Sequence, residues 1–246
     1  AVWNVLNSFT LSAIPLFIIL GEIMLRSEVS KKIYVALSPL FQNIPGGLLH
    51  TNIAVCTLFG AVSGSSLSTA AAVGSVAYPE MTERGYDKKM VVGSLAGGGT
   101  LGLLIPPSLS LLIYGALTET SIGQLFLAGI IPGVLFAIMF MIYIYFKCMR
   151  QSPLAPTDDT VFKFTKIIID ILSIWPFLIV VFAIMGSITF GIATPTEAAG
   201  VGVIATIILG KLWGSLTFRK LVEAIFSATL LYASIMFVVI GATILA

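Results

Sequence analysis

Residues 63–69 read Ser-Gly-Ser-Ser-Leu-Ser-Thr, a hydroxyl-rich stretch in the middle of an apolar run over residues 52–77. Basic clusters, which favour the cytoplasmic side of a membrane, flank this run at positions 26–32 and 84–89. Each apolar arm has about eleven residues and reaches about 16 Å, roughly half the hydrocarbon thickness of a bilayer. Residues 52–77 therefore predict a re-entrant hairpin that enters from the cytoplasm, turns at mid-membrane and goes back.

The composition is that of an integral membrane protein. Of the 246 residues, 58% are hydrophobic and 10% are charged, whereas soluble domains carry about 25% charged residues. Long apolar runs between short basic clusters predict several helical spans in a lipid bilayer. We expect an all-α polytopic membrane protein with no nucleic-acid partner and no cofactor. Cys56 and Cys148 lie in separate apolar runs, which favours buried free thiols over a disulfide or metal pair.

The positions of the basic residues predict how the remaining helices cross the membrane. If all four basic clusters face the cytoplasm, the number of crossings between successive clusters is even. Residues 90–146 then form one pair that turns at 118–121, and residues 167–209 form another that turns at 191–194. Further predicted elements are an inward crossing over residues 9–25, interfacial amphipathic helices over 29–41 and 216–226, and a last outward segment from Phe226.

A second unusual stretch lies at residues 97–108, where Gly-Gly-Gly-Thr-Leu-Gly is followed by Leu-Leu-Ile-Pro-Pro-Ser. Consecutive glycines weaken a helix, and Pro106 and Pro107 remove two amide donors. The stretch predicts a broken helix, with halves near residues 90–96 and 107–117. Together the two interruptions predict one site, in which hydroxyl and carbonyl oxygens suit a monovalent cation and the half-helix from Leu67 onward suits an anion.

Other interpretations of these residues remain open. The serines and glycines of the hairpin could serve only for close helix packing. The match of residues 97–102 to G-x-G-x-x-G lacks the preceding strand of a dinucleotide site. Thr194 and Glu197 favour a helix-capping box over an acidic site. For His50, the favoured interpretation is a residue at the membrane interface whose hydrogen bonds are satisfied. Since no carboxylate is expected at mid-membrane, a proton relay is disfavoured and sodium fits better.

Two segments hint at an internal inverted repeat. Residues 11–21 faintly resemble residues 231–241, and the basic clusters predict that the first runs inward and the second outward. Similar segments in opposite orientation are what an inverted repeat would give.

The chain resembles the large membrane subunit of the TRAP transporters, the tripartite ATP-independent periplasmic carriers. Six motifs in order carry the resemblance over essentially the whole chain, at residues 14–21, 59–66, 79–87, 99–108, 127–133 and 194–199. The resemblance implies a sodium-driven secondary transporter of the elevator type in a bacterial or archaeal inner membrane, not an enzyme. It also implies three partners: a periplasmic substrate-binding protein, a small four-helix membrane subunit and an organic-acid substrate such as a C4-dicarboxylate, a sialic acid or another sugar acid.

The resemblance also implies roles for individual residues. Sodium, as the coupling ion, would be coordinated by hydroxyl or carbonyl oxygens of Ser63, Gly64, Ser65, Ser66, Gly99, Thr100 and Gly102. Ser68, Thr69, Pro107 and Ser108 are the candidates for the substrate carboxylate or for holding the tip. Two alternatives from other classes are an intramembrane serine hydrolase, for which His50 is the sole histidine, and a ligand-free membrane scaffold.

The expected organisation has three parts. Residues 1–50 would form a scaffold-type span and an interfacial helix. Residues 51–118 would form a transport-type half, with the re-entrant hairpin at 52–77 and the broken helix at 88–117. Residues 119–246 would form further spans and the start of a second inverted repeat. An opening span, a second hairpin and a second broken helix are expected outside this chain, so that this chain alone should not transport.

Overall fold

The computed structural model describes residues 11–151, 154–155, 170 and 172–245, and all regular secondary structure over these residues is helical. The helices are α2 (Ala13–Arg26), α3 (Val29–Phe41), α4 (Leu48–Ser63), α5 (Ser66–Glu83), α6 (Lys88–Leu104), α7 (Leu109–Leu117), α8 (Ile122–Arg150), α10 (Trp175–Thr189), α11 (Pro195–Leu212) and α12 (Phe218–Leu245). Among the described residues, four segments are long and apolar enough to cross a membrane: Lys88–Leu117, Ile122–Arg150, Pro195–Leu212 and Phe218–Thr243. The protein is thus a polytopic, all-α membrane protein.

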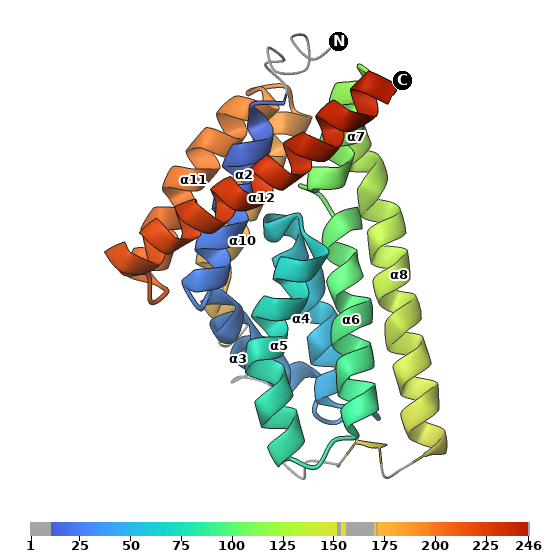
Figure 1. Ribbon diagram of the computed structural model, residues 1–246. Helices are drawn as coiled ribbons and strands as arrows, with labels where there is room; N and C mark the ends of the chain where they lie inside the picture. Colours follow the sequence, from blue (N-terminus) through green and yellow to red (C-terminus); the bar gives the residue numbers. More distant parts are fainter. Residues whose placement is uncertain (1–10, 152–153, 156–169, 171, 246) are drawn as a thin grey trace.

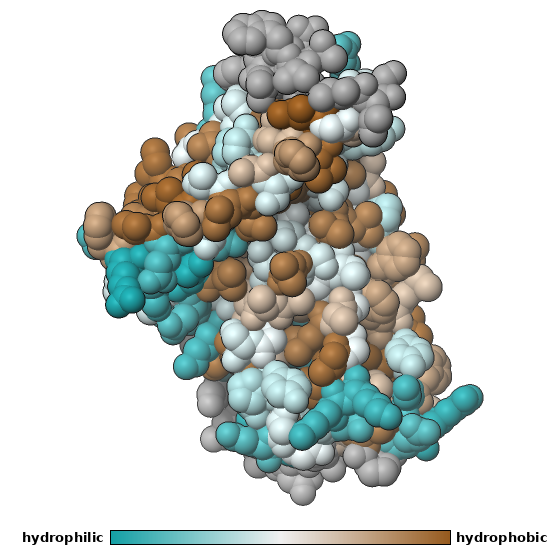
Figure 2. Space-filling view, viewed as in Figure 1, coloured by the Kyte–Doolittle hydropathy of each residue, from teal (hydrophilic) through white to brown (hydrophobic). Residues whose placement is uncertain are grey.

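The helices gather into two neighbouring groups (Figure 1). In one group α2 packs against α11 and α12, and α10 packs against α11. In the other group α4, α5 and α6 pack together, and α8 lies along α4 and α6. Figure 2 shows hydrophilic side chains gathered at the lower end of the molecule, where α6 begins and α8 ends. A second hydrophilic patch lies on the left, where α12 begins.

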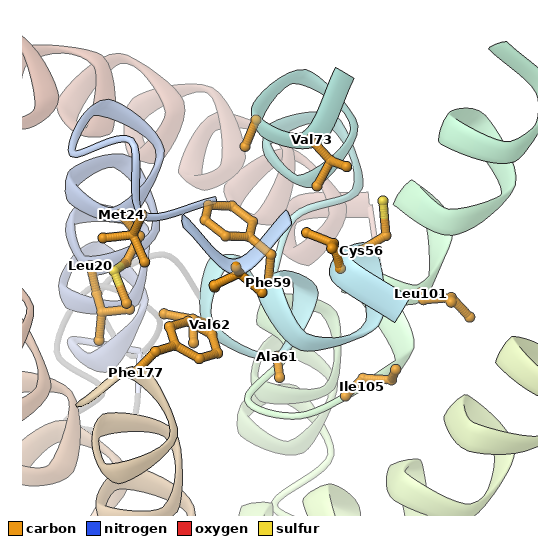
Figure 3. Close-up of a cluster of buried hydrophobic side chains, with 14 of the residues drawn as sticks. Leu20, Met24, Cys56, Phe59, Ala61, Val62, Val73, Leu101, Ile105 and Phe177 are labelled. Atoms are coloured by element: carbon orange, nitrogen blue, oxygen red, sulfur yellow. The ribbon is translucent and has the colours of Figure 1, made fainter. Parts of the chain in front are cut away.

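The core between the two groups is built from large apolar side chains. Phe59, Leu20 and Phe177 are completely buried. Figure 3 shows that they come from three different helices, α4, α2 and α10, and that Met24, Val62 and Val73 lie around them. Burial of each large apolar side chain contributes about 1.5–3 kcal/mol relative to exposure, so this cluster holds α4 and its tip against α2.

Helices α4 and α5 form the predicted hairpin, with a turn at Gly64 and Ser65. Both outer ends of the hairpin lie at the lower end of the molecule, while its tip lies beside the junction of α6 and α7 (Figure 1). The arms are longer than the expected eleven residues, with 16 in α4 and 18 in α5. Helical hydrogen bonding does not stop where the apolar run stops, and α5 continues through polar residues to Glu83.

The break in the next helix is shorter than predicted. Helix α6 runs without interruption through Gly97, Gly98 and Gly99 to Leu104, so the expected half-helix end near Ala96 is wrong. Only residues 105–108 separate α6 from α7, and the peptide bond between Pro106 and Pro107 is cis. Gly98 and Gly99 pack closely against the hairpin, and this packing compensates for the low helix propensity of glycine.

The other helices agree only in part with those predicted from the sequence. Helix α3 buries Ile33 and Leu37 and exposes Lys31 and Lys32, as the amphipathic pattern predicts. The separate interfacial helix expected over residues 216–226 is wrong, because α12 is one helix of 28 residues from Phe218. Where a crossing is predicted over residues 167–188, the described residues form α10 from Trp175, an apolar helix of 15 residues that is shorter than the four candidate spans. Residues 9 and 10, and most of residues 167–171, lie outside the described residues.

The two segments of the possible repeat lie in α2 and α12, which cross in close contact. Helix α2 descends from the N-terminal end in Figure 1 and α12 rises toward the C-terminal end, so the two helices run in opposite directions. The repeat itself stays a prediction.

Candidate functional site

The tip of the hairpin is a two-residue turn closed by backbone geometry and one side chain. Gly64 has φ +58°, a left-handed conformation that glycine adopts without strain, and its N–H donates to the carbonyl of Gly60. Ser65 is extended and caps α5, since its hydroxyl accepts the N–H of Ser68 at 3.4 Å. The chain therefore reverses direction within two residues, and α5 begins at once.

A small hydroxyl network holds this turn. The hydroxyl of Thr69 donates to the carbonyl of Ser65 at 2.7 Å. Because that bond uses the only hydroxyl proton of Thr69, the hydroxyl of Ser63, 2.6 Å away, donates to Thr69. Thr69 is completely buried and Ser63 is 2% exposed, whereas Ser65 and Ser66 are only partly buried. Ser63 and Thr69 thus shape the tip, and the oxygens of Ser65 and Ser66 remain more accessible.

The junction of α6 and α7 lies directly against the tip. Because Pro106 and Pro107 lack an N–H, the carbonyls of Gly102 and Leu103 lose their usual helical donors. The hydroxyl of Ser108 donates to the carbonyl of Leu103, which satisfies one of the two. The N–H of Leu109, the first residue of α7, donates to the carbonyl of Gly64 at 3.4 Å and links the junction to the tip.

Four helix ends therefore converge at one place. The C-terminal ends of α4 and α6, which carry partial negative charge, meet the N-terminal ends of α5 and α7, which carry partial positive charge (Figure 1). Such a site can offer carbonyl and hydroxyl oxygens to a cation and backbone N–H groups to an anion. Both kinds of ligand could then lie within one small volume.

The glycines proposed as sodium ligands bring the hairpin close to α6. A Cβ atom at Gly102 would lie 2.6 Å from the Thr69 hydroxyl and 3.0 Å from the Ser65 carbonyl oxygen. A Cβ atom at Gly99 would lie 2.8 Å from the Cβ of Ala70. Both residues are buried against α5. Of the two, Gly102 has a carbonyl without its usual helical donor, because Pro106, four residues further on, has no N–H.

The other predicted residues differ in how they are placed. Thr100 is exposed, and its hydroxyl donates to the Gly97 carbonyl at 2.6 Å within its own helix. Ser68 is partly buried in the first turn of α5, next to Ser66. Pro107 and Ser108 are buried, and the carbonyl of Pro107 would lie 3.1 Å from a Cβ at Gly64. The structure thus brings together all of the predicted residues except the side chain of Thr100.

Two further glycines contribute to the tip, although their positions were not predicted as part of the site. A Cβ at Gly60 would lie 2.7 Å from the Cα of Gly102, so α4 and α6 touch backbone to backbone there. A Cβ at Gly21 of α2 would lie 2.9 Å from the carbonyl oxygen of Ser63. The only signal in the sequence is the small residue itself, because spacing alone does not show which helix approaches it.

Acid–base chemistry has no support at the tip. The imidazole Nε2 of His50 lies 2.9 Å from the Pro45 carbonyl, so this histidine is satisfied. It lies at the other end of α4 from Ser63, about 20 Å away along the helix axis. Among the described residues, no group of three or more His, Cys, Asp and Glu side chains could hold a metal ion.

Several smaller predictions are confirmed or corrected. The capping box is present, with the N–H of Thr194 donating to the Glu197 carboxylate at 2.8 Å. Both cysteines are free and buried. Ser121 and Gln124 have the spacing of a similar capping pair at the start of α8, but Ser121 makes no side-chain cap hydrogen bond there.

Comparison with known proteins identifies a family over the whole chain. The family described as "Tripartite ATP-independent periplasmic transporter, DctM component" matches residues 1–246. The chain is 38% identical over 200 residues to the C4-dicarboxylate TRAP transporter large permease protein of Pseudomonas aeruginosa, a match that covers 80% of this chain and 45% of that protein.

Two other relatives match nearly all of this chain. The ectoine TRAP transporter large permease protein of Halomonas elongata is 35% identical over 237 residues, 94% of this chain and 54% of that protein. The sialic acid TRAP transporter large permease protein of Vibrio cholerae is 33% identical over 241 residues, 97% of this chain and 56% of that protein. The chain thus spans about half the length of the curated relatives that it matches.

Proposed function

Because this chain belongs to the family of TRAP transporter large permeases, a family of transport proteins and not of enzymes, we propose that it forms half of a sodium-coupled carrier for organic acids. The hairpin tip and the junction of α6 and α7 would supply this half of the ion and substrate site. The observation that carries the proposal is the convergence of four helix ends at residues 63–69 and 102–109.

In this proposal sodium is held by uncharged oxygens at the tip. Support is strongest for Ser65, whose oxygens are more accessible, and for Gly102, whose carbonyl lacks its usual donor. Ser63 and Gly64 would contribute from the same turn. Ser66 and Gly99 would contribute through the adjoining backbone. Thr100 has the least support, because its hydroxyl bonds to its own helix. Neutral oxygens suit a monovalent cation that must also be released.

The substrate would be an organic acid with its carboxylate near the start of α5. Ser66 and Ser68 lie in the first turn of α5, where helix polarity favours an anion. Thr69, Pro107 and Ser108 would act by holding this turn in place. The relatives are named for C4-dicarboxylate, ectoine and sialic acid, so the comparisons do not select one substrate.

The same proposal includes the rest of the system. A periplasmic binding protein would deliver the substrate, and a small four-helix membrane subunit would accompany the permease in the inner membrane. The hairpin would dip into the bilayer from the cytoplasmic side. The remaining part of the site would come from the portion of the full-length permease that this chain does not include.

The experiment is sodium-dependent uptake by the full-length permease with its partners in vesicles. We expect Ser65→Val together with Ser66→Val to lower uptake roughly tenfold or more, which needs a loss of only about 1.4 kcal/mol in sodium binding. Membrane insertion should not change. The matched control is Ser234→Val, since Ser234 is exposed on α12 and bonds only to its own helix.

Three outcomes would contradict the proposal. Unchanged uptake by the double variant would remove sodium coordination from the tip. Absence of any sodium-dependent shift in the unfolding temperature of the full-length protein would favour a ligand-free scaffold. Labelling of Ser63 or Ser65 by a serine-reactive probe would favour a hydrolase.

A further inference from the structure

A groove runs between α6 and α8 on the side of α6 away from the hairpin tip. Its cavity has a volume of about 490 Å³. We call it the α6–α8 groove, and its principal lining residues are Lys89, Gly93, Gly97, Phe136, Phe140 and Lys147. None of these residues belongs to the proposed sodium and substrate site.

The two glycines of the groove leave space, whereas Gly99 and Gly102 bring helices together. A Cβ at Gly93 would meet nothing within 4 Å, and one at Gly97 would first meet the ring of Phe140 at 3.7 Å. The hollow between α6 and α8 therefore comes from the missing side chains at these two positions.

One end of the groove is cationic. Lys89 lies in the first turn of α6, and Lys147 lies in the last turn of α8. The ammonium group of Lys147 donates to the Tyr143 hydroxyl at 3.1 Å. Within the described part of the chain, neither lysine forms an ion pair. Hydrophilic side chains gather at this end of the molecule, where α6 begins and α8 ends (Figure 2).

Among the described residues beside Lys89 and Lys147 along the chain, positive charge predominates. Lys88 and Arg150 lie next to the two lysines along their helices. The acidic neighbour is Asp87, whose carboxylate accepts the N–H of Met90 at 2.9 Å as a helix cap. The N-terminal end of α6 adds partial positive charge. This end of the groove therefore attracts an anion.

The rest of the groove is apolar and faces outward. The side chains of Phe136 and Met139 are 46% and 52% exposed, on a helix whose composition suits a membrane span. Along α6 the groove extends from Lys89 to Gly97, about 12 Å. A groove with a cationic end and an apolar, outward-facing body suits an acidic headgroup followed by an alkyl chain.

We infer that the α6–α8 groove binds an anionic phospholipid, with acyl carbons along Gly93, Gly97 and Phe140 and the phosphate at Lys89 and Lys147. Basic pockets between membrane helices on the cytoplasmic side suit acidic headgroups, and the apolar channel adds contact that a free anion cannot use. The bound phospholipid contacts both α6 and α8. Helix α6 leads into the junction at residues 105–108.

The test is retention of phosphatidylglycerol by the full-length permease purified from mixed phosphatidylglycerol and phosphatidylcholine vesicles, measured by native mass spectrometry. We expect Lys89→Gln with Lys147→Gln to lower retained phosphatidylglycerol roughly tenfold, since each lysine near an acidic headgroup contributes several-fold. The matched control is Lys31→Gln with Lys211→Gln, two exposed basic residues outside the groove.

A second variant tests the apolar part without changing charge. Gly93→Leu with Gly97→Leu fills the hollow and should lower retention of the same lipid, while the protein still folds because leucine favours the helix. Inorganic phosphate should not compete with the lipid. Unchanged retention in either double variant, competition by phosphate, or a protein segment found in the groove of the full-length protein would overturn the inference.

Discussion

Gly102 shows at the level of one residue how the tip is kept compact. Its hydrogen atom faces the Thr69 hydroxyl and the Ser65 carbonyl, and Gly60 meets it from α4. Polar groups of the turn can therefore lie directly on the backbone of α6. The same small size that lowers helix propensity is what permits this contact.

We predict that Gly102→Ala destabilises the protein by about 1–3 kcal/mol, the usual cost of overpacking. The added Cβ would lie 2.6 Å from Thr69 Oγ1 and 3.0 Å from the Ser65 carbonyl oxygen, so the turn must shift. Thermal unfolding of the full-length protein in detergent measures the effect.

The matched control is Gly200→Ala in α11, where a Cβ would meet nothing within 4 Å. There the substitution should raise stability by about 0.5–1 kcal/mol through helix propensity. Equal unfolding temperatures for the two variants would show that the close contact at Gly102 does not limit the stability of the protein.

At this scale the sequence predicted which residues lie near the tip better than it predicted where each side chain points. The hydroxyl-rich stretch at 63–69 stood out because polar residues are rare in an apolar run. Thr100 also stood out, but its side chain turns outward. A helix has several faces, and the face that meets a neighbour depends on packing that a single sequence does not contain.

At the level of elements, the proline pair decides where the helix breaks. Pro106 and Pro107 remove two donors, whereas the glycines at 97–99 only weaken the helix. Packing against the hairpin overcomes that weakness. The sequence therefore predicted that a break exists but placed its start too early.

The hairpin predicts that both of its ends face the same side of the membrane. In a background with Cys56 and Cys148 replaced, Asn43→Cys and Glu83→Cys should react with an impermeant maleimide only from the cytoplasmic side. Both native residues are exposed and lie near the two ends of the hairpin. Labelling of right-side-out and inside-out vesicles measures this.

The control position is Glu119, which lies in the turn between α7 and α8. Glu119→Cys should react from the opposite side. Reaction of positions 43 and 83 from different sides would mean that the segment crosses the membrane, and the proposed site would lose its basis.

At the level of the whole molecule, ion pairs join helices that are far apart in sequence. Arg26 at the end of α2 pairs with Glu223 of α12 at 3.1 Å, and Lys220 pairs with Glu28 at 2.8 Å. These contacts fix where α12 crosses α2 (Figure 1). The i, i+4 spacing of Glu22 with Arg26 and of Arg219 with Glu223 predicts two local pairs, and both are present. The sequence did not predict the long-range pairs, because spacing within one helix says nothing about its partner.

We predict that exchanging the charges at Glu28 and Lys220 restores most of the stability that either single reversal removes. The pair is partly exposed, so each single change should lower stability by less than about 1 kcal/mol. Unfolding temperatures of Glu28→Lys, Lys220→Glu and the double variant measure the coupling. Additive losses in the double variant would contradict a direct interaction.

This pair also has a predictable response to pH. The hydrogen bond from Lys220 lowers the pKa of the Glu28 carboxyl from its ordinary value of 4.5. A carboxyl with a lowered pKa stabilises the fold above the unfolded value and loses that contribution as the pH falls through the folded value. The benefit of the pair should therefore be complete at neutral pH and disappear only in acid below about pH 4.5.

The contact of Gly21 with the Ser63 carbonyl has a mechanical consequence. With only hydrogen at position 21, α2 meets the Ser63 carbonyl by backbone alone, so no side chain lies between them at this one contact. Around it, the buried side chains of Leu20, Met24 and Phe59 pack together and hold the two helices in place. A single methyl group at position 21 would push the tip away from α2 and loosen that packing.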